Sequence, residues 1–241
     1  MKLTLCTAAA LAAAIFCGVA ADAASVDINP VRIDLAGTGV PAEIKLTNTG
    51  DTELSVQVDA LQWQQDLDGA DQLLETNELL AVPPLFSIPP GEHQIVRVGF
   101  LGEQSPELEQ SFRLLVTELA AAPDAQSTSQ LSMRMRFSIP AFVTPSIAVP
   151  RPSIVVNDVT KRDDATIVRI ENVGNAHAQV AEINIRGEDG WYSLAQAQAV
   201  RYLLPGAIAT VVVPLETGEL SAIRISSIDG RDWEYVVRSS Q

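Results

Sequence analysis

The sequence is poor in the residues on which enzymes, metal sites and disulfide-rich proteins depend. It contains two cysteines, Cys6 and Cys17, and two histidines, His93 and His177, each in or beside a predicted turn. It has no phosphate loop, dinucleotide fingerprint, HExxH pair or nucleophile elbow. The acidic run 66–71 has its glycine too early for an EF-hand and is expected to be a solvated loop. We therefore expect no enzymatic activity, no metal site and no cofactor.

Long apolar runs are also lacking, except at the N-terminus. Residues 3–20 are uncharged and rich in Ala and Leu, Lys2 precedes them, and Ala21-Asp22-Ala23 ends in the small residues that a signal peptidase prefers. The sequence thus predicts a signal peptide over residues 1–23 and export of the remainder, without stable insertion in a membrane. Both cysteines lie in this segment, so the mature chain would have no disulfide or thiol. A lipid anchor at Cys17 is the less favoured alternative, because a bulky residue precedes it.

Basic residues are scarce as well. The chain has 16 Lys and Arg against 30 Asp and Glu, which gives a formal charge of −14. Such acidity disfavours nucleic acid or an anionic lipid surface as a partner, so we expect neither. Any basic binding site must be a local exception to this overall charge.

Amphipathic helical patterns are absent, whereas short alternating segments separated by turn residues recur along the chain. Regular short strands with turns between them indicate an all-β sandwich architecture. The acidic stretch 66–80 is the only segment for which we expect a short helical turn or an ordered loop. The segments with alternating polarity are 42–47, 54–58, 95–98, 113–117, 131–140, 167–170, 180–185 and 210–213.

A weak internal repeat indicates two domains. Residues 44–50, IKLTNTG, resemble residues 168–174, VRIENVG, and a Pro-Gly pair follows each of them at 90–91 and 205–206. Two stretches with the same order of strand, Asn-x-Gly turn, strand and Pro-Gly turn predict two immunoglobulin-like sandwiches in tandem.

The join between them is expected in the proline-rich segment 144–152, because prolines interrupt strand pairing. This places the domains at residues 24–145 and 150–241.

The most informative segment is 131–140, LSMRMRFSIP. Its apolar residues alternate strictly with polar ones, which is a strand pattern. The polar positions include Arg134 and Arg136, and guanidinium groups suit bidentate capture of a carboxylate. Alternation alone leaves two interpretations open, since the apolar row can face its own core or be added to the sheet of another protein.

Four motifs in a fixed order resemble the periplasmic chaperones of the chaperone–usher pathway, the PapD-like family that assembles pili. They are Pro30-Val-Arg32, PPLFSIPPGEHQIVRVGF over residues 83–100, SFRLLVTE over 111–118 and the alternating segment 131–140. The resemblance implies two immunoglobulin-like domains in a boomerang arrangement with a cleft between them. It also implies a periplasmic, non-enzymatic protein that binds pilus subunits by donor-strand complementation and delivers them to an outer-membrane usher. A self-dimer of the free chaperone is a further implied possibility.

The resemblance also implies roles for individual residues. Arg32 matches the first of two basic residues that hold the terminal carboxylate of the subunit. The second, usually a lysine, falls at Pro140, so Arg136 is the nearest basic candidate. The donated apolar row corresponds to Leu131, Met133 and Met135.

Two further pairs follow from the same alignment. Pro83 and Pro84 match a proline pair near the start of the subunit-binding site, and Glu118 and Asp229 are candidates for contacts between the domains. The family's usual interdomain arginine has no counterpart between Pro140 and Pro145, so a different contact is expected to hold the hinge.

Two other functions compete with this interpretation. A secreted structural or adhesive fibre component made of two immunoglobulin-like domains would need an unpaired N-terminal extension, and residues 24–35 are short for that purpose. A carbohydrate-binding sandwich would need an aromatic platform, but Trp63, Trp191 and Trp233 are scattered among predicted strands and turns.

Overall fold

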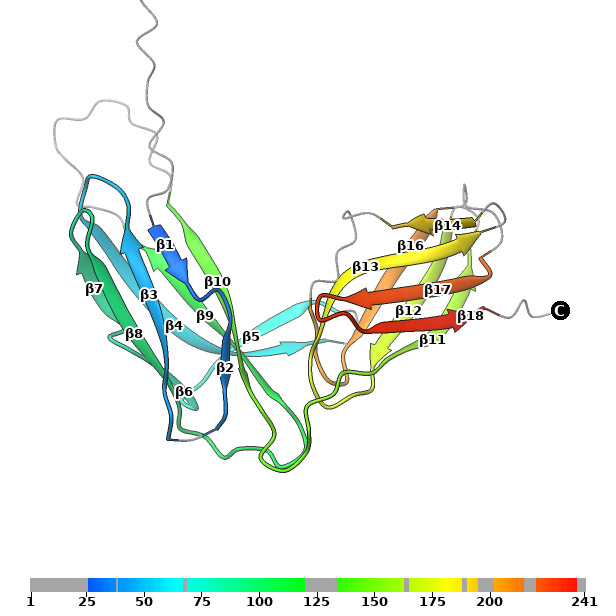
Figure 1. Cartoon of the computed structure of the whole chain (residues 1–241), viewed down its shortest axis with the longest axis horizontal. Coiled ribbons are helices and arrows are strands. Elements are labelled where there is room, and N and C mark those ends of the chain that lie inside the picture. Colours follow the sequence, from blue (N-terminus) through cyan, green and yellow to red (C-terminus); the bar gives the residue numbers. More distant parts are fainter. Residues whose placement is uncertain are drawn as a thin grey trace, which may run out of the picture.

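The computed structural model describes residues 26–37, 39–66, 69–119, 134–162, 165–187, 190–194, 202–214 and 220–237. These residues form strands and connecting turns, with no helix among them, which confirms the all-β prediction. Two β-sandwiches meet at an angle, so that the molecule has the shape of a boomerang (Figure 1). Nothing in the described part of the chain qualifies as a membrane-spanning helix.

The described residues of the first sandwich form ten strands in two sheets. One sheet has the order β1-β3-β8-β6 and the other the order β2-β10-β9-β4-β5, with β7 paired to β4. The core between them contains apolar side chains from both sheets, including the fully buried Ile44, Val96, Phe112 and Leu114. The strands are β1 Val26–Asn29, β2 Ile33–Leu35, β3 Ala42–Asn48, β4 Leu54–Gln65, β5 Asp71–Glu75, β6 Leu79–Val82, β7 Leu85–Ile88, β8 His93–Phe100, β9 Gln110–Glu118 and β10 Arg136–Val143.

In the second sandwich, the described residues form eight strands. Its sheets have the orders β11-β12-β16 and β14-β13-β17-β18, with β15 paired to β13. Its core includes Ile154, Ile170, Ile185 and Ile225, and it also takes in one residue pair from the first sandwich, described below. The strands are β11 Ile154–Lys161, β12 Ala165–Asn172, β13 Ala178–Gly187, β14 Gly190–Ser193, β15 Tyr202–Leu203, β16 Ile208–Pro214, β17 Ala222–Ser227 and β18 Asp232–Val236.

The expectation of a helical turn or loop over residues 66–80 is wrong. Strands β4 and β5 form a long hairpin in which Leu61 faces Glu75 and Gln65 faces Asp71. Its turn is stabilised by Asp66, whose carboxylate accepts the backbone N–H of Ala70 at 2.9 Å. All five residues of β5 are exposed, so this strand lacks the alternation by which strands are recognised.

The internal repeat corresponds to a repeated structural feature. Asn48 and Asn172 are both fully buried, and each donates its side-chain amide to two backbone carbonyls. One carbonyl belongs to the residue four positions later, which is Thr52 or Ala176. The other belongs to the strand just before the Pro-Gly turn, at Ile88 or Leu203. Each asparagine also accepts the N–H of the glycine two residues on, at 3.0 Å in both sandwiches. The two sandwiches therefore close the same turn with the same side chain.

The alternating segment 131–140 is only partly described. Leu131 and Met133 lie outside the described residues, and β10 begins at Arg136. Within β10, Ile139 is buried in the first core and Phe137 packs against it. For these two residues the apolar row faces its own sandwich.

Candidate functional site

Strand β10 has a free edge along its first half. On one side it pairs with β9 from Arg136 to Val143. On the other side β2 pairs with it, in parallel, only at residues 141–143. Among the described residues nothing is paired with residues 136–140 on that side, and such an edge exposes unpaired N–H and C=O groups.

Arg32 stands where this free edge ends. Because Ile33 pairs with Ala141, Arg32 is level with Pro140 and next to the last unpaired position of β10. Arg113 of β9 lies directly opposite Pro140 on the other side of the strand. Side chains of successive strand residues point to opposite faces, so Arg113 lies on the face opposite the first core. One row across this sheet is buried in that core and consists of Ile33, Ala141 and Phe112.

The Arg32 side chain lines a cavity of about 310 Å³ between the two sandwiches. It is bound to Asp34 of β2, with Nε and Nη2 at 3.0 and 2.9 Å from Oδ2. The two side chains are 44 and 50% exposed. Arg32 is therefore a solvated guanidinium at the junction of the two sandwiches.

Arg113 lies in a more enclosed place. Its guanidinium carbon is 3.6 Å from the centre of the Trp63 ring and 5.5 Å from that of Tyr202. Its Nη2 lies 3.8 Å from Oδ2 of Asp71. Burial lowers the pKa of the guanidinium, an effect that the Asp71 carboxylate opposes. Arginine remains charged even so, and Arg113 is therefore a largely buried cation packed on an aromatic face. Sequence reasoning misses Arg113, because its position beside Pro140 depends on the register between two strands.

The predicted second anchor, Arg136, is not placed beside Arg32. It pairs with Thr117 and lies four residues before Pro140, which corresponds to about 13 Å along a strand. The basic residue at the level of Arg32 is Arg113.

The other predicted residues of the first sandwich lie around the same sheet. Met135 is half-buried and exchanges bonds with Glu118, whose backbone N–H donates to the Met135 carbonyl and whose carboxylate accepts the Met135 N–H. The described contacts of Glu118 are thus within the first sandwich. Pro83 and Pro84 connect β6 to β7, and Pro84 lines a groove of about 930 Å³ beside Leu61 and Leu115.

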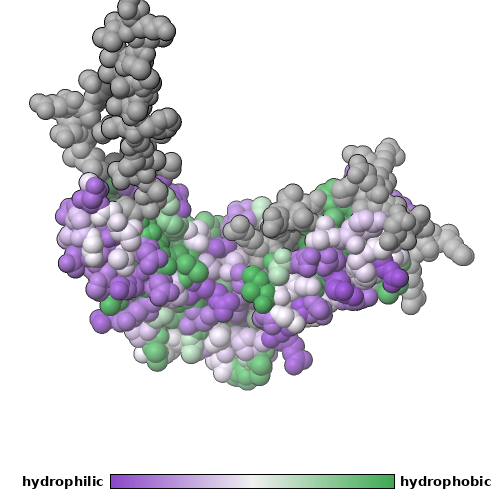
Figure 2. All heavy atoms as spheres, turned by 45° about the horizontal axis from the view of Figure 1, so that its top comes forward, coloured by the Kyte–Doolittle hydropathy of each residue, from purple (hydrophilic) through white to green (hydrophobic). Residues whose placement is uncertain are grey.

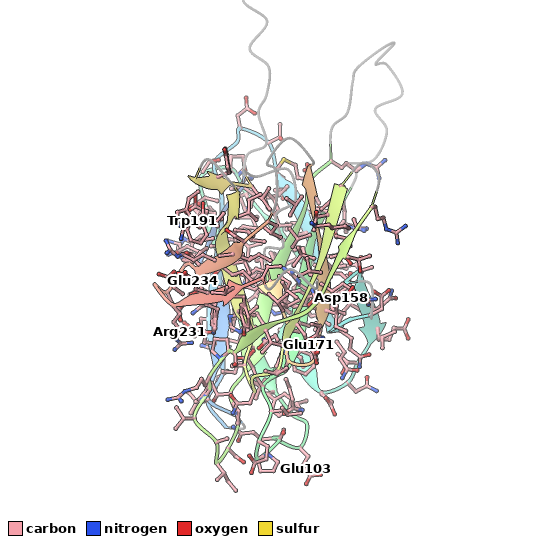
Figure 3. The ribbon with its side chains drawn as sticks, turned by 90° about the vertical axis from the view of Figure 1, so that its right-hand side faces the viewer. Glu103, Asp158, Glu171, Trp191, Arg231 and Glu234 are labelled. Carbon is pink, nitrogen blue, oxygen red and sulfur yellow. The ribbon has the colours of Figure 1, made fainter. Side chains whose placement is uncertain are left out.

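Asp229 is the predicted residue that the second sandwich contributes to the cavity. Asp229 lies in the turn between β17 and β18, together with Arg231, and both residues line the cavity. In Figure 3, Arg231 is on the opposite side of the second sandwich from Asp158 and Glu171. A hydrogen bond from Ser227, with a smaller contribution from Arg231, lowers the pKa of the Asp229 carboxyl.

Two clusters connect the sandwiches. In the first, the buried Glu109 carboxylate accepts the backbone N–H and binds Nδ1 of His177 at 2.9 and 2.7 Å, and the imidazole stacks on Phe142 at 3.6 Å between ring centres. In the second, the side chain of Gln65 donates to the Tyr202 carbonyl and accepts the N–H of Leu204. Trp63 and Phe142, both from the first sandwich, are buried in the core of the second. These contacts hold the two sandwiches together in a chain that has no arginine between Pro140 and Pro145.

Comparison with solved structures identifies the architecture. A chain of the complex between CsuC and the tip adhesion subunit CsuE, from the archaic chaperone–usher Csu pili of Acinetobacter baumannii, matches with a TM-score of 0.68 and 22% identity, over 88% of this chain and 97% of that one. The Salmonella enterica complex of SafA pilin with the SafB chaperone matches with a TM-score of 0.63 and 17% identity, over 88 and 96%. The E. coli chaperone DraB matches with a TM-score of 0.58 and 13% identity, over 89 and 98%. At these identities the matches establish the fold.

Membership follows from the sequence family model. The model of the pili and flagellar-assembly chaperone PapD N-terminal domain matches residues 25–148, while a search of curated proteins finds no match. This match covers more than half of the chain, and it includes β1 to β10 with Arg32, Arg113 and the free edge of β10. The chain therefore belongs to the PapD-type family of pili and flagellar-assembly chaperones.

Proposed function

We propose that this chain binds pilus subunits in the periplasm by donor-strand complementation and passes them to an outer-membrane usher. The observation that carries the proposal is the free edge of β10, which ends beside Arg32, with Arg113 of β9 opposite Pro140 on the other side of the strand. The related structures support it, since two of them are described as complexes of a chaperone with a subunit or pilin. The proposal includes removal of residues 1–23 as a signal peptide, domains at 24–145 and 150–241, and a self-dimer of the free protein through the same edge.

The edge of β10 suits an added strand because its backbone groups are available there. A subunit strand paired to residues 136–140 would complete its own sheet with main-chain hydrogen bonds. If its carboxyl end is to reach Arg32, it must run in the same direction as β10, because Arg32 lies at the end of the free edge toward Val143. This fixes the direction of the bound strand.

Two guanidinium groups would hold the terminal carboxylate. We assign the roles to Arg32 and Arg113, which flank Pro140, in preference to Arg136, which lies farther along the strand. Charge-assisted bonds of this kind also set the register, and a slip by one residue would present the wrong side chains to the subunit.

The apolar row of the donated strand would be Leu131, Met133 and Met135. Met135 leads into β10 at its free edge, next to Arg136. Methionine is flexible and polarizable, so this row would adapt to grooves of different shape. The proline pair Pro83 and Pro84 would border the bound subunit through the groove that Leu115 of β9 shares.

The test is a competition for a limiting amount of subunit. Wild type and Arg32→Ala, each with a different affinity tag, are co-expressed with a pilin subunit, and the amount of subunit captured by each is compared. Loss of a charge-assisted hydrogen bond of about 1.5–3 kcal/mol predicts roughly tenfold to hundredfold less subunit on the variant. Met135→Asp is expected to reduce capture as well, because it places a charge in the donated row.

Arg97→Ala is the matched control. Arg97 is an exposed arginine on β8 that pairs with Glu43 in the other sheet, so its loss should leave capture unchanged. Equal capture by wild type, Arg32→Ala and Met135→Asp would refute the donor-strand function.

A further inference from the structure

Every basic side chain that lines the interdomain cavity, among the residues that the structure describes, already faces a carboxylate of the same molecule. Arg32 binds Asp34, His177 binds Glu109, and Arg231 lies 3.2 Å from Asp229. In the free protein, each of these basic groups therefore already has an anionic neighbour. An anion that binds the Nε and Nη2 donors of Arg32 must displace Asp34 from them.

The three pairs differ in how firmly they are held. The His177 and Glu109 side chains are only 12 and 4% exposed, and Glu109 also accepts a backbone N–H, so removing one partner would leave a buried group unpaired. Asp229 is additionally bonded to Ser227. The Arg32–Asp34 pair is about half exposed on both sides, as is the Arg231–Asp229 pair, and ion pairs of this kind contribute little to stability. Of the two arginines, Arg32 is the one that lies at the end of the free edge of β10.

The geometry of the Arg32–Asp34 pair resembles what a bound terminus would form. Asp34 uses one oxygen, Oδ2, to accept from both Nε and Nη2 of the guanidinium. These two donors form the edge of arginine that binds a carboxylate in bidentate fashion. Asp34 lies between Ile33 and Leu35 of β2, which face the first core, so its side chain is on the opposite face; Arg32 directly precedes this strand.

We propose that Asp34 is an internal competitor for the subunit. In the free protein its carboxylate occupies the donors of Arg32, and the terminal carboxylate of a subunit displaces it on binding. Asp34 thereby weakens the complex by competing for the donors of Arg32, which favours later release of the subunit. This inference rests on the proposed function and names a residue that sets the affinity of the same site.

The experiment uses the competition assay described above with the full chain and the same pilin subunit. Asp34→Asn keeps the size of the side chain and removes its charge, and it is expected to capture about threefold to tenfold more subunit than wild type. Asp27→Asn, the same change at an exposed position on the neighbouring sheet, controls for net charge and should capture the same amount as wild type. Equal or lower capture by Asp34→Asn would overturn the proposal.

A double variant distinguishes competition from other effects. If Asp34 acts through Arg32, then Arg32→Ala and Arg32→Ala/Asp34→Asn should capture equal amounts, because there is no guanidinium left to free. A gain from Asp34→Asn that persists without Arg32 would also overturn the proposal. Failure of the proposed function gives a different result, since Arg32→Ala alone would then capture as much subunit as wild type.

Discussion

Asn48 and Asn172 show how a single side chain can organise a turn. Each is buried, and each bridges two strands by donating to carbonyls at 2.7 to 2.9 Å while accepting the N–H of the following glycine. Buried backbone groups require such partners, because their loss of hydration is otherwise uncompensated. The Asn-x-Gly repeat is visible in the sequence because a turn in each sandwich needs the same side-chain hydrogen bonds to its backbone groups.

Replacement of Asn172 by Ala should destabilise the second sandwich. The change leaves the carbonyls of Ala176 and Leu203 buried without their donor, and we expect a loss of about 2–4 kcal/mol in the free energy of unfolding. Urea denaturation followed by tryptophan fluorescence measures this loss. Asn157→Ala, on the exposed part of β11, should change the unfolding midpoint little, and equal effects of the two variants would contradict the argument.

At the scale of elements, alternation of apolar and polar residues in the sequence predicted the strands that have one buried face. Strands β3, β8 and β12 each contain a predicted segment and alternate between buried and more exposed residues. Strand β5 has no buried residue, so neither of its faces leaves a pattern in the sequence. Sequence-based expectation therefore fails on strands that are held only by backbone pairing to a neighbour.

The connection between the sandwiches depends on a close approach of two backbones at Gly174. A Cβ added there would lie 2.3 Å from the Arg151 carbonyl oxygen and 2.5 Å from the Ser153 nitrogen. The same linker is bonded to Asn175, whose Oδ1 accepts the Arg151 N–H at 2.7 Å. Only glycine allows the linker to pass this turn without a shift of the backbone.

Gly174→Ala should therefore loosen the linker. We expect a loss of about 1–3 kcal/mol in stability, typical of overpacking, together with faster cleavage of the segment 144–153 in limited proteolysis. Gly99→Ala is the matched control, since a Cβ at Gly99 meets nothing within 4 Å. Proteolysis of both variants at the wild-type rate would show that the close approach is not maintained in solution.

At the scale of the whole molecule, the angle between the sandwiches depends on a few contacts between polar and aromatic groups. Glu109 binds His177 across the junction. The side chains of Trp63 and Phe142, which belong to the first sandwich, are buried in the core of the second. The surface seen in Figure 2 is otherwise mainly hydrophilic, with small separate hydrophobic patches. The cavity at Arg32 exists only while this junction is closed, because both sandwiches line it.

Glu109→Ala should open the junction. The His177 backbone N–H and ring lose a buried charged acceptor, which corresponds to about 1.5–3 kcal/mol of interdomain coupling. We expect a larger radius of gyration in small-angle X-ray scattering and a second, lower thermal transition in calorimetry. Glu107→Ala, at an exposed position two residues earlier, should retain the wild-type profile, and the same profile for Glu109→Ala would contradict the assigned role.

The sequence by itself determined the fold class and the two-sandwich organisation, and it predicted Arg32 as a site residue. These properties depend on local alternation, on turn residues and on an ordered set of motifs, all of which can be read along one chain. Only the tertiary structure decided that Arg113, and not Arg136, is level with Arg32, and that Asp34 occupies its guanidinium. The physical reason is register: a shift of a few residues between strands moves a side chain by more than 10 Å, and no local pattern in the sequence records that choice.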